Sequence, residues 1–510
     1  MAFTMTVAEL IDADTSGLLG KHATWERVPL AEVAAILNGA PFDAALFNTT
    51  NGMPLVRIRD VTAGQTNTYY SGSYEEAYLV HQGDLLVGMD GDFNSAFWGP
   101  KTALLNQRVC KISPIEAFYD KRLLALALPG YLAAINANTP SVTVKHLSSK
   151  TIGEIGLPLP PAAEQTRIVA KLEELLSDLD AGVAELKAAQ KKLVQYRQSL
   201  LKAAVEGALT AEWRTQHQPL ETGAQLLQRI LQERRARWEA RQLAKFKAQG
   251  KTPPKDWQKK YPEPVQPDTT GLLELPEGWV WATLSQAGWL DRGKSKHRPR
   301  NASHLYGGPY PFVQTGDIRH SDTYIANVEA TYSEAGLAQS RLWPVGTMCI
   351  TIAANIGKTA LLSMEACFPD SVVGFLSGAD HVSVRYVEYF MRSIQQQLED
   401  EAPATAQKNI NLEILEKVVI PIPPINEQLQ IVQRLVDAFA SASDQARAIG
   451  FALKQATAQR QNILRAAFSG QLVPQDPADE PASVLLERIR AERAAQGAQP
   501  RKRRAAKETS

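Results

Sequence analysis

The sequence contains itself twice, and this duplication restricts the possible folds more than any other feature. The segment Leu157–Gln165 recurs 263 residues later as Ile420–Gln428, and both copies read Pro-x-Pro-Pro followed by Glu-Gln. The same offset carries Gly207 onto Gly470 without a gap, and a second block, Leu226–Arg234, returns further along the chain. A period this long excludes a solenoid. The duplication could lack functional meaning, but we favour a pseudo-twofold protein that offers the same surface twice.

The first part of each copy, residues 20–156 and 275–419, combines short apolar runs with turn residues. Leu85–Gly88 and Met348–Ile352 each follow a glycine-containing turn and read as buried strands. The two copies differ in most other positions of this part, as expected for a duplicated scaffold with divergent loops. The sequence therefore predicts two mixed α/β domains.

The second part of each copy predicts a long helix. After the Pro-Pro pair, apolar positions recur at steps of three and four, and in the first copy they include the heptad leucines Leu172, Leu179, Leu186, Leu193 and Leu200. The second copy has a seam rich in alanine, with larger residues at Ile431, Leu435, Ile449 and Ile463. Small side chains would let the leucine seam approach closely, so we expect one antiparallel helix pair that acts as a spacer. Two separate helices, each packed on its own domain, remain the alternative.

These patterns predict an α+β fold: two mixed α/β domains joined by two long helices that form an antiparallel coiled coil, with a pseudo-twofold repeat. The expected segments are a first domain (1–156), a first long helix (157–209), a basic helical connector (210–274), a second domain (275–419), a second long helix (420–472), and a C-terminal helix with a basic tail (473–510).

No motif predicts catalysis by this chain. Gly357-Lys358-Thr359 lacks the earlier glycine that a phosphate-binding loop needs, and no acidic-x-Lys triplet follows Asp370, which reads as a turn residue. The three cysteines and the histidines have no metal-ligand spacing, so we expect no bound metal or cofactor and a reducing cytoplasm. The longest apolar run, Leu123–Leu128, is too short to span a membrane.

Binding chemistry remains. The net charge is only +1, so any contact with DNA must come from local patches. Arginine and lysine can neutralise phosphates, while arginine, asparagine and glutamine can also read base edges. The candidates in the first domain are Arg57, Arg59, Asn67, Tyr69, Lys101, Gln107 and Arg108. Those in the second are Arg292, Lys294, Lys296, Arg298, Arg300, Gln314, Arg319, Asn355 and Lys358. For the basic loop 291–300, a solvated loop is the alternative.

Two dissimilar domains, each followed by a long helix that starts with Pro-x-Pro-Pro and Glu-Gln, resemble the specificity subunits of type I restriction-modification enzymes. The stretch Leu275–Trp279, Leu-Pro-Glu-Gly-Trp, is similar to the start of the second half in this family. The resemblance implies two target recognition domains that read the halves of an asymmetric DNA site. It also implies that the helix pair sets their spacing and docks two methyltransferase subunits, which restriction subunits join.

In that family S-adenosylmethionine, ATP and Mg are bound by the partner subunits, which methylate adenine or cleave DNA, and this chain would have no catalytic activity of its own. Two alternatives stay open. One is a coiled-coil scaffold that binds only proteins, and the other is an orphan methylation system without a nuclease.

Overall fold

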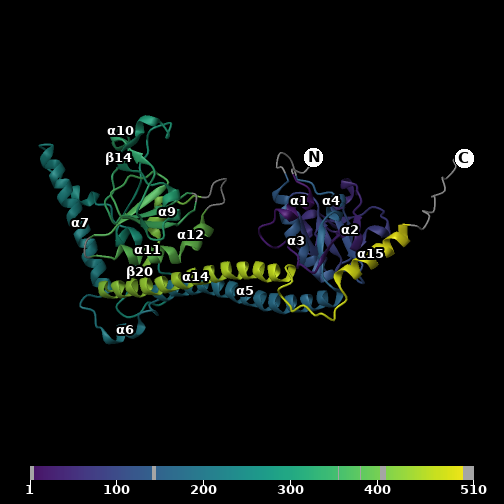
Figure 1. The fold of residues 1–510 in the computed structure, drawn as a ribbon. Coiled ribbons are helices and arrows are strands. Elements are labelled where there is room, and N and C mark those ends of the chain that lie inside the picture. Colours follow the sequence, from purple (N-terminus) through teal and green to yellow (C-terminus); the bar gives the residue numbers. More distant parts are fainter. Residues whose placement is uncertain (1–4, 140–144, 354, 379–380, 403–408, 498–510) are drawn as a thin grey trace. The chain divides into compact units, whose positions relative to one another are not determined.

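The computed structural model describes residues 5–139, 145–353, 355–378, 381–402 and 409–497, and the basic run Arg501–Arg504 lies outside them. The chain divides into two compact units. Unit 1 consists of residues 1–187 and 450–510, and unit 2 consists of residues 188–449. Each unit contains one globular domain and a part of each of two long helices (Figure 1).

The two long helices, α5 (Ala162–Val205) and α14 (Ile425–Phe468), have 44 residues each. Each begins directly after a Pro-Pro pair, because proline is tolerated at a helix start but not in its interior. Each ends just before a glycine with positive φ, Gly207 at 77° and Gly470 at 72°. Each long helix follows its Pro-Pro pair, five residues after the expected segment starts at 157 and 420, and Gly207 ends α5 a few residues earlier than expected.

Contacts within each unit show that the helices run antiparallel. In unit 2, Arg197 donates to Ser443 Oγ at 2.7 Å and Arg434 donates to the carbonyl of Leu209 at 2.6 Å. Residues later in α5, and the segment directly after it, therefore contact residues earlier in α14. The corresponding contacts of unit 1 join Arg460 to Asp180 and Arg167 to Asp479. The predicted antiparallel pairing is confirmed.

The domain of unit 1 contains small sheets. Their strand orders are β1-β11, β2-β10-β7-β8 and β3-β5-β4-β9-β6. The strands are β1 (Glu26–Pro29), β2 (Ala34–Asn38), β3 (Phe47–Asn48), β4 (Met53–Val56), β5 (Tyr69–Tyr70), β6 (Leu79–Val80), β7 (Leu85–Gly88), β8 (Asn94–Phe97), β9 (Ala103–Leu105), β10 (Val109–Pro114) and β11 (Gly156–Leu159). The helices are α1 (Val7–Asp12), α2 (Leu30–Val33), α3 (Lys121–Ala137), α4 (Ser149–Gly153) and, from the end of the chain, α15 (Ala482–Gly497). The apolar run Leu123–Leu128 lies in α3 and packs into the main core of this unit.

The domain of unit 2 has a related plan, with strand orders β12-β20, β13-β19-β17-β18-β15 and β14-β16. The strands are β12 (Val280–Thr283), β13 (Trp289–Arg292), β14 (Tyr306–Pro311), β15 (Tyr324–Ile325), β16 (Thr331–Tyr332), β17 (Met348–Thr351), β18 (Thr359–Leu362), β19 (Val372–Leu376) and β20 (Val419–Ile422). The helices are α6 (Ala211–Gln216), α7 (Gly223–Ala248), α8 (Leu284–Ala287), α9 (Thr315–His320), α10 (Glu334–Ala338), α11 (Val384–Ser393), α12 (Gln395–Glu401) and α13 (Leu412–Lys417). The strands predicted at Leu85 and Met348 are confirmed as β7 and β17.

The repeated Glu-Gln pair anchors each long helix to its domain. Trp25 donates from its indole nitrogen to Glu164, and Trp279 donates in the same way to Glu427, each at 2.9 Å. Both carboxylates are only 1% exposed. The neighbouring glutamines, Gln165 and Gln428, each accept a backbone N–H of their domain at 2.8 Å, from Asp120 and Ser383 respectively. The motif therefore fixes where a helix leaves its sheet.

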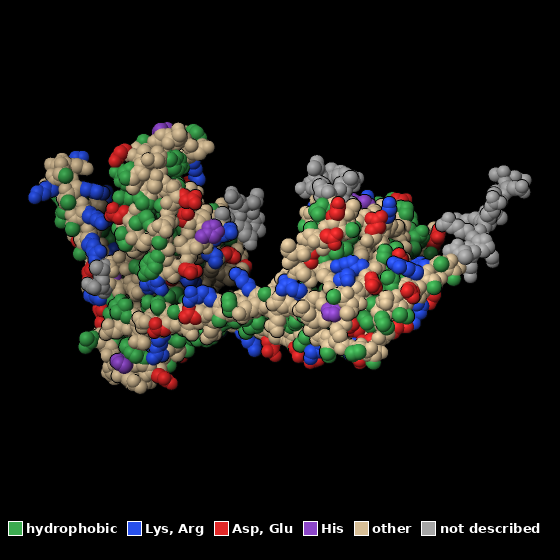
Figure 2. All heavy atoms as spheres, viewed as in Figure 1, with side chains coloured by type: hydrophobic (Ala, Val, Ile, Leu, Met, Phe, Trp, Pro, Cys, Tyr) green, Lys and Arg blue, Asp and Glu red, His purple; other side chains and the backbone are tan. Residues whose placement is uncertain are grey.

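The second repeated block, Leu226–Arg234 and its later copy, lies in helices that pack on the two domains. In unit 2, Arg234 of α7 donates to the carbonyls of Ser285 and Gly288. In unit 1, Arg493 of α15 donates to the carbonyls of Ala31 and Glu32. Helix α7 thus packs on the domain of unit 2, and helix α15 packs on the domain of unit 1. The region predicted as basic contains α7, along which lysine and arginine side chains are exposed (Figure 2).

Candidate nucleic-acid interface

One sheet edge of unit 1 collects most of the predicted DNA-binding residues of the first domain. Strands β4 and β9 are parallel, with Val56 level with Leu105, so both chains leave the sheet at the same edge. Arg57 follows β4 and Gln107 follows β9 after one intervening residue, and both are exposed. An arginine and a glutamine, the side chains suited to guanine and adenine edges, are therefore neighbours here.

The neighbouring strand adds further polar groups to this edge. Strand β5 runs antiparallel to β4, and Leu55 N donates to the carbonyl of Thr68 at 2.9 Å, so exposed Asn67 comes level with the end of β4. Arg59 donates to Thr68 Oγ1 at 3.4 Å and remains largely exposed. Tyr69 lies inside β5, half-buried, and is set back from the edge.

Arg108 and Lys101 differ from this group. Arg108 forms an ion pair with Asp90 at 3.2 Å, and the same carboxylate contacts His146 at 2.5 Å. Lys101 precedes β9 and therefore lies at the opposite end of that strand from Gln107. The structure thus brings Arg57, Arg59, Asn67 and Gln107 together, pairs Arg108 with Asp90 and separates Lys101 from the group.

The domain of unit 2 presents the same edge with different side chains. Phe312 and Cys367 form a parallel bridge, and Gln314 follows as Arg57 follows β4. In both domains the backbone N–H of this residue is capped by an aspartate three residues on. Asp60 accepts from Arg57 N at 2.9 Å, and Asp317 accepts from Gln314 N at 2.7 Å. A single capped turn therefore displays arginine in one domain and glutamine in the other.

The basic loop 291–300 is partly neutralised by Asp370. Arg300 binds both carboxylate oxygens of Asp370, at 2.8 and 2.9 Å, and Arg292 donates to the Asp370 carbonyl at 2.6 Å. Asp370 lies in a turn, as the sequence predicted. Its contacts with the arginines were missed, because these partners precede it by 70 and 78 residues. Arg298 folds back to the carbonyl of Ser295 at 2.7 Å.

Lys294 and Lys296 are the cations that this loop leaves available. Both side chains are exposed, and among the described residues neither ammonium group has a hydrogen-bond or ion-pair partner. Their backbones are held in place, since Lys294 N donates to the Phe368 carbonyl at 3.1 Å and Lys296 N donates to Gln339 at 2.5 Å. A fixed loop with two free ammonium groups suits contact with phosphates.

The turn between β17 and β18 reaches the same edge. Strands β13 and β17 both pair with β19, and their ends lie beside its first residues, close to Asp370. Exposed Asn355 has a φ of 74°, and Lys358 N is held by Thr351 Oγ1 at 3.1 Å. Arg319 is exposed in the last turn of α9, away from the capped turn at Gln314.

The predicted spacer residues lie along the helix pair. In the described structure Leu172, Ile431 and Leu435 are fully buried, at 0% exposure. The remaining seam residues, Leu179, Leu186, Leu193, Leu200, Ile449 and Ile463, are half-buried, as expected for a two-helix seam.

Other site chemistry is absent from the described part of the chain. Its residues include no group of His, Cys, Asp and Glu side chains placed to hold a metal ion. None of its helices has both the length and the apolar content needed to cross a membrane. Cys110, Cys349 and Cys367 are free and buried, and burial raises the pKa of Cys110 to about 12. Such a thiol is a poor nucleophile at neutral pH.

Comparison with known proteins agrees with this architecture. The sequence model of the type I restriction modification DNA specificity domain matches residues 22–190 and again residues 276–446. The chain is 35% identical over 516 residues to the specificity subunit of type I restriction enzyme EcoBI from Escherichia coli, with 98% of each chain covered. It is 26% identical over 403 residues to the EcoDI specificity subunit from Escherichia coli, covering 77% of this chain and 80% of that protein.

A solved structure described as showing complex assembly and conformational transition of the type I R-M system contains a chain with a similar fold. The TM-score is 0.58 at 19% identity, with 88% of this chain and 98% of that chain covered. The two matched segments and the full-length relative settle the family. The chain belongs to the specificity subunits of type I restriction-modification enzymes, which recognise DNA and are not themselves catalytic.

Proposed function

We propose that the two equivalent sheet edges read the two halves of a bipartite, asymmetric DNA sequence. The observation that supports this most directly is the capped turn that carries Arg57 in unit 1 and Gln314 in unit 2. Arginine matches the O6 and N7 acceptors of guanine, and glutamine matches N6 and N7 of adenine. One scaffold with two different reading side chains is what an asymmetric site requires.

The helix pair has a second role in this proposal, as spacer and docking platform for two methyltransferase subunits. Val194 and Tyr196 of α5 support docking, because these apolar side chains are 57% and 47% exposed. Restriction subunits would join the methyltransferases. S-adenosylmethionine, ATP and Mg would be bound by these partners, and adenine would be methylated. We place the complex in the cytoplasm, where its DNA substrate is found and free thiols persist.

Sequencing of modified adenines tests the reading role. A host that expresses this chain with its methyltransferase should show one bipartite methylated sequence. Arg57→Gln should change the base preference at one position of one half-site, because a bidentate contact contributes about 1–3 kcal/mol of discrimination, roughly 5- to 150-fold. Lys101→Ala is the matched control, since Lys101 is exposed in the same domain but away from the edge. Changes in both half-sites, or in the control alone, would contradict the proposal.

The spacer role needs an insertion in both helices, because they are paired. Four residues near Ala189 of α5 and four near Ala452 of α14, its equivalent 263 residues on, lengthen each helix by about 6 Å and nearly preserve its facing. The gap between half-sites should grow by one or two base pairs, at about 3.4 Å per base pair, with both half-site sequences unchanged. A single-residue insertion rotates the leucine seam by about 100° and should be far more damaging. A stable four-residue variant that methylates only the original spacing would refute the role.

A further inference from the structure

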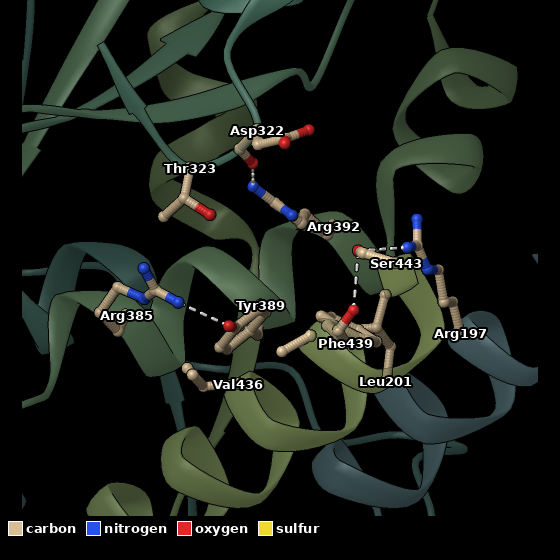
Figure 3. A pocket seen from close by; sticks show the side chains of 11 residues that line it. Arg197, Leu201, Asp322, Thr323, Arg385, Tyr389, Arg392, Val436, Phe439 and Ser443 are labelled. Carbon is tan, nitrogen blue, oxygen red and sulfur yellow. Dashed lines mark hydrogen bonds between the residues drawn. The ribbon is translucent and has the colours of Figure 1, made fainter. Parts of the chain in front are cut away.

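The two units contain equivalent cavities between domain and helix pair. The cavity of unit 1 is lined by Arg122 of α3, Glu173 and Asp180 of α5, and Arg460 of α14. The cavity of unit 2 has a volume of about 320 Å³, and its lining includes Arg385, Val436, Ser443 and Arg197 (Figure 3). Each of these residues of unit 1 has its counterpart of unit 2 at a distance of 263 positions in the sequence: Arg122 and Arg385, Glu173 and Val436, Asp180 and Ser443, Arg460 and Arg197. The internal repeat therefore relates the two cavities residue by residue.

The arginines have carboxylate partners in unit 1. Arg122 forms an ion pair with Glu173, and Arg460 forms one with Asp180. Two positive charges therefore meet two negative charges, and this cavity carries no charge in excess from these residues.

The arginines are kept in unit 2, but the carboxylates are not. Val436 stands where Glu173 stands in unit 1, and Ser443 stands where Asp180 stands. Arg197 donates to Ser443 Oγ at 2.7 Å, and Arg385 donates to the hydroxyl of Tyr389 at 2.5 Å. Both partners are neutral. The Nε atoms of both arginines are buried and have no hydrogen-bond partner among the described residues.

Among the described residues no carboxylate forms an ion pair with Arg197 or Arg385, although the charge of Glu388, which is paired with Arg392, also acts on Arg385. Arg392 uses Glu388 and the carbonyl of Asp322 as its partners. The Asp322 side chain also lines the cavity, but among the described residues it forms no ion pair with Arg197 or Arg385 (Figure 3). Partly desolvated guanidinium groups without an anion are costly unless a partner supplies one.

The lining also indicates what kind of anion fits. Leu201, Val436 and Phe439 give the cavity an apolar floor beside the arginines. The methylene groups of an aspartate or glutamate can cover such a floor while the carboxylate reaches a guanidinium, whereas a DNA phosphate has no apolar part to bury there. The equivalent arginines of unit 1 do form ion pairs with carboxylates, which supports a carboxylate as the ligand in unit 2.

We propose that the unit 2 cavity binds acidic side chains of a protein partner and that unit 1, whose arginines are already paired, has no such site. This partner is the methyltransferase subunit, an assignment that rests on the proposed function. The two methyltransferases would then bind with unequal affinity, the tighter one at unit 2.

The test supplies the missing carboxylates from the chain itself. Val436→Glu with Ser443→Asp gives unit 2 the residues that unit 1 already accommodates, so folding should be retained, as the thermal unfolding midpoint can verify. Native mass spectrometry and sedimentation with increasing methyltransferase measure each binding step. One of the two dissociation constants should rise at least tenfold, while the other and the DNA affinity of the chain stay the same. Val436→Gln with Ser443→Asn is the matched control, which fills similar space without charge and should stay within threefold of wild type.

Each other outcome overturns the inference in a distinguishable way. If both variants assemble normally, the arginines do not bind the partner. If the acidic variant assembles normally but binds DNA more weakly, the cavity serves phosphates instead. If the neutral control loses binding equally, shape and not charge matters. If the wild-type chain binds no methyltransferase at all, the proposed function fails as well, and the wild-type titration alone reveals it.

Discussion

Replacing Glu427 with glutamine should destabilise unit 2 far more than the equivalent Glu164→Gln destabilises unit 1. Glu427 accepts from Thr210 Oγ1 at 2.7 Å, from Arg214 Nε at 2.9 Å and from Trp279 at 2.9 Å. The Arg214 side chain is only 20% exposed, so loss of the carboxylate leaves a largely buried cation without its anion. Glu164 instead accepts from two neutral donors, the Trp25 indole and the Gln475 amide.

The two substitutions should also have different effects on the free energy of unfolding because the environments of the two carboxylates differ. Burial raises the pKa of Glu164, so folding disfavours its ionised form, and a neutral amide removes that cost. We expect Glu164→Gln to change the free energy of unfolding by less than about 1 kcal/mol, and Glu427→Gln to lower it by about 2–4 kcal/mol. At roughly 2–4 °C per kcal/mol for a unit of this size, the second variant should unfold roughly 5–15 °C earlier.

Differential scanning calorimetry measures both midpoints, and hydrogen–deuterium exchange assigns each transition to a unit. Equal losses in the two variants would refute the argument, because they would show that the indole bond, which both glutamates share, dominates. A larger loss in Glu164→Gln would refute the role given to Arg214.

Three further predictions concern DNA binding, acid stability and catalysis. Replacing Lys294 and Lys296 by alanine should lower the slope of log affinity against log salt by about 1.8, at about 0.9 for each phosphate contact, whereas Arg300→Gln with Asp370→Asn removes a paired set and should leave the slope unchanged. The hydrogen bond between Arg167 and Asp479 holds the pKa of the Asp479 carboxyl below its usual value. The ionised carboxylate therefore stabilises unit 1 above the ordinary aspartate pKa, and this contribution is lost as pH falls through the lowered pKa. In Asp479→Asn the unfolding midpoint of unit 1 should depend less on pH in that acidic range. The purified chain should neither methylate nor cleave DNA in radiolabel and gel assays, and robust methyl transfer without partners would contradict its non-catalytic role.

Local patterns predicted the repeated parts of the fold well. The Pro-Pro pairs and the heptad leucines act through neighbouring residues, and α5 and α14 each begin directly after their Pro-Pro pair. The strands at Leu85 and Met348 followed from short apolar runs next to turns. Such signals need no knowledge of the rest of the chain.

Partners distant in sequence could not be predicted in this way. The charge run 291–300 gave no indication that Arg292 and Arg300 contact Asp370, while Lys294 and Lys296 stay free. The equivalence of Arg57 and Gln314 was hidden as well, because it depends on strand pairing and not on the 263-residue offset. The roles of these residues at the DNA remain predictions.

Unit 1 is built from two separate segments of the chain, and this has a consequence for its folding during synthesis on the ribosome. Its core joins residues of the first domain, such as Trp25, to Phe468, Leu485 and Ile489 near the end of the chain. Unit 2 is continuous in sequence and can be completed while translation is still under way, whereas unit 1 must wait for the last segment to emerge. A premature stop near residue 470 would therefore spare the second domain and leave the first one, made long before, without part of its core.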